Sequence, residues 1–133
     1  MIETAMVFTE SGAILYWHDI EGRTGTSIPD SRKLWDVLWK CRDHLGGVAH
    51  SHPWDGPSAP SYTDLTTFRA IEAALGRKLL WPIVTMTHVN FFARVDNVHG
   101  GVHYGLVTNP FIGDFNWRKA VELLRDESRE VIQ

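Results

Sequence analysis

The chain has 133 residues, of which 44% are hydrophobic and 22% are charged, and its formal net charge is −3. These values fit one soluble globular domain that can bury its own core, and they exclude the intrinsically disordered and fibrous classes. Because no strong positive charge covers the molecule, nucleic acid is not an expected partner.

The N-terminal segment predicts a β-hairpin. Residues 4–8 and 13–17 are short, mostly apolar runs, and the turn-forming residues 10–12 separate them, which is the pattern of two paired strands. A third, shorter strand is expected over residues 26–28, because Pro29 follows it and cannot donate a hydrogen bond within a central strand.

A helix is expected next, beginning at Asp30 or Ser31, since either side chain can cap its N-terminus. Its apolar stripe, spaced by three or four positions, consists of Leu34, Leu38, Cys41 and Leu45. The pair Gly46-Gly47 is expected to end this helix. Residues 48–49 are then a short apolar strand that leads directly into two histidines.

The second half of the chain predicts two further helices around three strands. One helix begins after Ser61 and ends at Gly76, and its apolar positions are Leu65, Phe68, Ile71 and Leu75. Alternating β-branched, aromatic and polar residues predict strands over residues 79–87, 89–95 and 102–107. Asp114 or Asn116 can cap a last helix, whose core positions are Trp117, Ala120, Val121 and Leu124.

This order of elements predicts an α/β fold. Two or three strands, a helix, a strand, a helix, three strands and a final helix fit a curved mixed β-sheet that is sandwiched by helices. The chain contains no repeat, low-complexity stretch or interdomain linker. We therefore expect a single domain over residues 1–133.

Two histidines at the end of the short central strand carry the clearest chemical signal. His50 and His52 are two positions apart, so in an extended strand both side chains point to one face, about 7 Å apart along the backbone. Pro53 follows at once and forces the chain out of the sheet. Both imidazoles therefore face a loop and can reach one metal ion.

Asp64 lies twelve residues after His52, in the first turn of the second predicted helix. Its carboxylate completes a set of two histidines and one aspartate, and three protein ligands with a fourth position for water is the pattern of a catalytic zinc site. Nitrogen ligands favour zinc over calcium or magnesium, and cobalt, manganese and iron remain alternatives.

The motif made of His50, His52, Pro53, Ser61 and Asp64 resembles the signature of the JAMM/MPN zinc metallopeptidases at all five fixed positions. The resemblance implies an MPN fold, similar to that of cytidine deaminases, over the whole chain, as in the compact prokaryotic members. It implies that His50, His52 and Asp64 bind zinc. Ser61 would then stabilise the oxyanion by donating a hydrogen bond.

The resemblance also implies a glutamate general base near the start of the first strand. Glu3 fits this position, although Met6 stands where the family tends to have glycine. Glu10 is an alternative, because it precedes Gly12 in the same first segment, and Glu21 is a weaker one.

Several of these residues also have simpler interpretations. Ser61 and Asp64 suit the first turn of a helix, where an oxygen acceptor and a negative charge meet exposed amides. Trp54, next to the histidines, is either a packing residue or part of a substrate groove.

The implied activity is zinc-dependent hydrolysis of peptide or isopeptide bonds, with a protein or peptide substrate such as a ubiquitin-like C-terminus. The alternatives are a non-catalytic MPN-like scaffold and a zinc amidohydrolase of small adducts. No segment approaches the roughly 20 apolar residues of a membrane span, and the N-terminus lacks a signal-peptide pattern. With the single Cys41, which cannot form an internal disulfide, we expect a cytoplasmic protein without a membrane partner.

Overall fold

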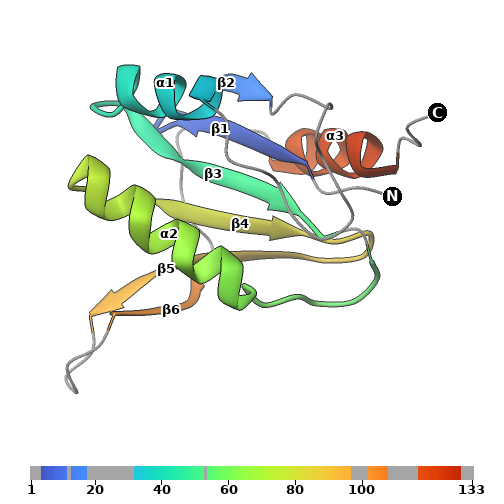
Figure 1. The fold of residues 1–133 in the computed structure, drawn as a ribbon. Helices are drawn as coiled ribbons and strands as arrows, with labels where there is room; N and C mark the ends of the chain where they lie inside the picture. The colour runs from blue at the N-terminus through green and yellow to red at the C-terminus, as the bar shows by residue number, and fades with distance from the viewer. Residues whose placement is uncertain are drawn as a thin grey trace.

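The computed structural model describes residues 4–11, 13–17, 32–52, 54–96, 102–107 and 117–129. Six strands and three helices lie within these ranges (Figure 1). In chain order they are β1 (Ala5–Thr9), β2 (Ile14–Trp17), α1 (Arg32–Lys40), β3 (Leu45–Ser51), α2 (Tyr62–Leu75), β4 (Leu80–Val84), β5 (Val89–Asp96), β6 (Val102–Val107) and α3 (Trp117–Arg129). Among the described residues, every helix is too short or too polar to span a bilayer.

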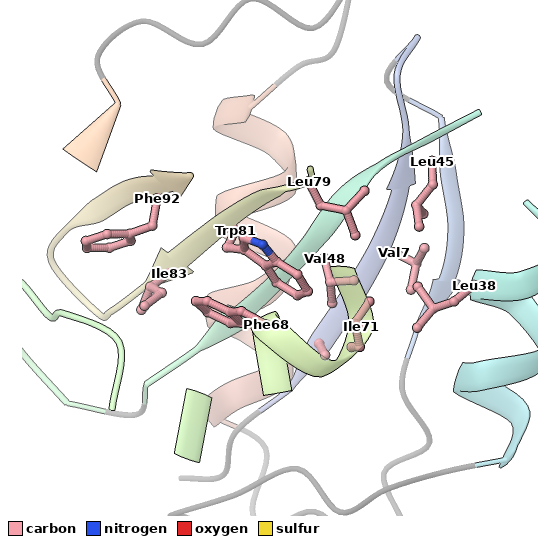
Figure 2. Close-up of a cluster of buried hydrophobic side chains, with 11 residues drawn as sticks. Val7, Leu38, Leu45, Val48, Phe68, Ile71, Leu79, Trp81, Ile83 and Phe92 are labelled. Atoms are coloured by element: carbon pink, nitrogen blue, oxygen red, sulfur yellow. The ribbon is translucent and has the colours of Figure 1, made fainter. Parts of the chain in front are cut away.

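The six strands form one mixed sheet in the order β2-β1-β3-β4-β5-β6. Only β3 and β4 are paired in parallel among these strands, and the other four pairs are antiparallel. Helices α1 and α2 cover one face of the sheet and α3 covers the other (Figures 1 and 2). The expected α/β fold with a mixed sheet between helices is therefore confirmed.

The larger hydrophobic core lies between the sheet and helices α1 and α2 (Figure 2). At its centre Trp81 of β4 stacks on Phe68 of α2, with ring centroids 4.2 Å apart. On the opposite face, Ala120, Val121 and Leu124 of α3 are buried against the sheet, as expected. Burial on both faces explains why the central strands are almost wholly apolar.

The predicted end of the first helix is wrong. Helix α1 ends at Lys40, and Leu45, Gly46 and Gly47 belong to β3. The two glycines are needed because neighbouring backbones approach closely: a Cβ at Gly47 would lie 1.9 Å from the Leu80 carbonyl oxygen. Glycine pairs serve close strand approach as well as helix termination. The expected strand over 26–28 and the caps at 30, 31, 114 and 116 lie outside the described residues.

A buried carboxylate anchors α2 to the sheet. Glu72 is 2% exposed, and it accepts hydrogen bonds from the Leu79 amide at 2.7 Å, from the Trp81 Nε1 at 3.1 Å and from the Tyr104 hydroxyl. Burial, and then the hydrogen bond to Glu72 and its charge, raise the pKa of Tyr104. These contacts connect α2 with β4 and β6 and so fix the helix that carries Asp64.

Candidate metal centre

His50 and His52 lie at the carboxyl end of β3 and point to the face covered by α2. His50 pairs with Ala5 of β1 and Ile83 of β4 in the sheet register, and its ring contacts Phe68 at a centroid distance of 6.1 Å. The two imidazoles are 7% and 2% exposed, and their Nε2 atoms are 3.1 Å apart. The alternation of side chains along β3 thus produces the predicted histidine pair.

Helix α2 brings Asp64 to the same point. Its Oδ2 lies 3.1 Å from the His52 Nε2 and 3.3 Å from the His50 Nε2. One ligand atom from each of the three residues lies within 4.8 Å of the others. The structure therefore brings together the three residues that the sequence spacing selected as metal ligands.

The chemistry of this group fits a metal ion. Two imidazole nitrogens and one carboxylate oxygen converge in a nearly buried position, and a cation can use a lone pair from each of them. Burial favours the neutral form of Asp64, but the hydrogen bonds to His50 and His52 and the charge of His50 outweigh it, so the pKa of the carboxyl lies well below its usual range. Asp64 is thus ionised, which is the form in which a carboxylate binds a cation.

Ser61 is the N-cap of α2, as predicted. Its Oγ accepts a hydrogen bond from the Asp64 amide at 3.1 Å, and Asp64 Oδ2 accepts one from the Ser61 amide at 2.9 Å. This reciprocal capping box satisfies two amides at the helix start. The capping role is confirmed, whereas the role of Ser61 in catalysis stays a prediction.

Of the three candidate general bases, the structure describes Glu10. Glu10 lies at the far end of β1, where its amide bonds to the His44 carbonyl and its carboxylate pairs with Arg77 at 2.7 Å. It lies five positions along the extended chain from Ala5, the partner of His50, which corresponds to roughly 17 Å. Glu10 is therefore remote from the histidines. Glu3, Glu21 and Pro53 lie outside the described residues.

Two residues of the following loop also contact His52. The Trp54 ring packs on the imidazole with centroids 4.5 Å apart and remains 44% exposed. Ser58, which no sequence pattern singled out, places its Oγ 2.5 Å from the His52 Nδ1. In the sequence, the feature that could have suggested this contact is a serine in the Pro-, Gly- and Ser-rich loop after the histidines.

Comparison of the chain with protein-family models finds no match, and comparison with curated proteins finds none either. The JAMM/MPN assignment accordingly remains a resemblance in motif spacing.

Proposed function

We propose that this protein is a zinc-dependent hydrolase of peptide or isopeptide bonds of the JAMM/MPN type. The observation that carries the proposal is the convergence of His50, His52 and Asp64 on one point. Two histidines and one carboxylate are a typical ligand set for catalytic zinc. Their spacing, together with Ser61, is that of the JAMM/MPN motif, which is the ground for choosing this bond type.

His50, His52 and Asp64 would hold the zinc ion. Zinc, when bound, supplies Lewis acidity, which lowers the pKa of water to about 7 and polarises a carbonyl. The protein contributes rigidity: His50 is fixed in a central strand, the amide of His52 donates to the Val84 carbonyl just after that strand, and Asp64 is fixed by the capping box of α2. Ligands held in this way need little reorganisation during a reaction.

Glu3 is our candidate for the general base, and contacts of its neighbours support this choice. The Thr4 amide donates to the Ser51 Oγ at 2.9 Å, and the Thr4 carbonyl accepts from the Ser51 amide at 2.9 Å. Ala5 is paired with His50, so the start of β1 lies beside the histidines. A carboxylate at position 3 would take a proton from water and pass it to the leaving amine.

Ser61 would stabilise the negative charge that develops on the scissile carbonyl. Its oxygen accepts the Asp64 amide hydrogen bond, and a hydroxyl that accepts in this way can still donate its own hydrogen. Its exposed position, three residues before a ligand, suits contact with a substrate. The capping and catalytic roles are therefore compatible.

The proposal has three alternatives, two of which differ in substrate and one of which lacks catalytic activity. A protein or peptide, such as a ubiquitin-like C-terminus, is our first choice, and a small amide adduct is the second, because the same ligand set serves either. A non-catalytic scaffold is the third. The intact ligand set argues against a scaffold, because a scaffold has no need for three converging ligands.

Hydrolysis assays on zinc-loaded protein test the proposal. We would follow cleavage of a ubiquitin-like C-terminal conjugate and of a small lysine amide, comparing wild type with Glu3→Gln and with Glu10→Gln as the matched control. We expect wild type and Glu10→Gln to cleave, and Glu3→Gln to lose at least about 100-fold in rate. Zinc-loaded wild type that cleaves neither compound would contradict the enzyme proposal and favour the scaffold.

A further inference from the structure

We propose that Ser58 is a positioning residue that accepts the Nδ1 hydrogen of metal-bound His52 and so orients the Nε2 of this ring toward the metal ion. The inference rests on the proposed metal site and deepens it. Ser58 Oγ lies 2.5 Å from the Nδ1 of His52, while the Nε2 on the other side of the ring faces His50 and Asp64. The two nitrogens of one imidazole thus have separate partners.

The direction of the hydrogen bond follows from the proposed metal site. With a metal ion on Nε2, the ring hydrogen of a neutral His52 lies on Nδ1, and Ser58 Oγ is placed to accept it. Ser58 Oγ can donate its own hydrogen to the Ala59 carbonyl, 3.4 Å away, and still accept from the ring. In the metal-free protein Asp64 Oδ2 accepts from the His52 Nε2, so metal binding would move the ring hydrogen to the side of Ser58.

The environment of His52 makes this acceptor necessary. The residue is 2% exposed, with Trp54 packed on its ring and His50 against its edge. Water has little access to a ring in this position, so an Nδ1–H without a partner would be energetically costly. Metal-binding histidines usually donate their second ring N–H to such an acceptor.

The loop that carries Ser58 is held in place by the turn between β4 and β5. The Gly56 amide donates to Thr87 Oγ1 at 2.7 Å, and its carbonyl accepts from Thr85 Oγ1 at 2.6 Å. Gly56 has a φ of 87°, which glycine adopts without strain. The Trp54 carbonyl accepts from the Met86 amide at 3.0 Å. These bonds present the Ser58 hydroxyl to the ring before any metal arrives.

The experiment compares Ser58→Ala, which removes the acceptor, with Ser58→Thr, which retains it. Zinc affinity is measured by competition with a chromophoric chelator. The exchange of the His52 Nδ1–H with water is measured in zinc-loaded protein by nitrogen–proton correlation NMR. We expect zinc affinity to fall by about 10- to 100-fold in Ser58→Ala and to stay near wild type in Ser58→Thr. In zinc-loaded wild type the Nδ1–H should exchange slowly, and in Ser58→Ala it should exchange about ten-fold faster, which corresponds to the loss of one hydrogen bond.

A zinc-loaded wild type whose His52 Nδ1–H exchanges as fast as that of a solvent-exposed histidine would overturn the proposal, even if Ser58→Ala failed to fold. Equal zinc affinity and equal exchange in wild type and Ser58→Ala would overturn it as well. Because neither measurement uses a substrate, their outcome is separate from that of the proposed hydrolysis. A wild type that binds zinc but cleaves nothing leaves the role of Ser58 intact.

Discussion

Asp64 Oδ2 accepts a hydrogen bond from the Ser61 amide at 2.9 Å, and the same oxygen lies 3.1 Å from the His52 Nε2. The capping interaction of α2 and the candidate metal centre therefore share one atom. Helix N-termini favour negative charge, and the Ser61 amide orients the carboxylate and adds to the larger effect of His50 and His52 in lowering its pKa. The shared atom therefore fixes the Asp64 carboxylate in place in the metal-free protein.

Replacing Asp64 with Asn separates its two roles. The amide oxygen can still accept from Ser61 and keep the helix capped, but the negative charge that His50 and His52 stabilise is lost, so we expect the free energy of unfolding of the metal-free protein to fall by about 1–3 kcal/mol. Zinc affinity should fall by more than about 100-fold, beyond the loss caused by an outer contact. Chelator competition and chemical denaturation measure the two quantities, with the exposed Asp36→Asn as control. Unchanged zinc affinity would remove Asp64 from the ligand set.

Glu72 should contribute strongly to stability. Its replacement by Ala would leave the Leu79 amide, the Trp81 indole and the Tyr104 hydroxyl without their acceptor. Because buried donors without partners are costly, we expect the free energy of unfolding to fall by about 3 kcal/mol. Glu72→Gln, which keeps one acceptor oxygen, should lose less. Urea denaturation measures both variants, and equal losses would show that the hydrogen bonds are unimportant.

Stability should decrease at alkaline pH in a manner that depends on Tyr104. Its pKa is raised in the folded protein by burial and by Glu72, so its contribution is complete below the unfolded pKa of about 10 and is lost as pH rises toward the folded value. The unfolded chain releases the proton first, which favours unfolding. Denaturation of wild type and Tyr104→Phe at pH 8 to 11 measures the effect. The two curves should converge as pH rises, and parallel curves would contradict the assignment.

Gly47 is expected to tolerate no side chain. An added Cβ would lie 1.9 Å from the Leu80 carbonyl oxygen and 2.9 Å from the Phe8 ring, so β3 and β4 would have to separate. We expect Gly47→Ala to lose at least about 1–3 kcal/mol of folding stability. Gly105→Ala is the control, because its Cβ would meet only a Val95 methyl group at 3.1 Å. Thermal unfolding compares the two, and an equal effect would contradict this explanation.

The histidine–aspartate group was predictable because its signals are local. Two histidines at strand spacing and an aspartate in a capped first helical turn can be recognised from positions along the chain, and the structure brings all three together. The roles of Ser58 and Glu72 were not predictable, since their partners depend on how a loop and a helix pack on other elements. For the same reason Gly47 was mistaken for a helix terminator. Its contact with Leu80 exists only in the assembled sheet.

The most direct test of the central claim is the zinc content of the purified protein. Wild type, His52→Ala and the control His103→Ala, which replaces an exposed histidine of β6, would be loaded with zinc, desalted and analysed by elemental mass spectrometry. We predict one zinc ion per chain in wild type and His103→Ala, and almost none in His52→Ala. A folded wild type that retains no zinc, or a His52→Ala variant that retains as much as wild type, would contradict the metal centre.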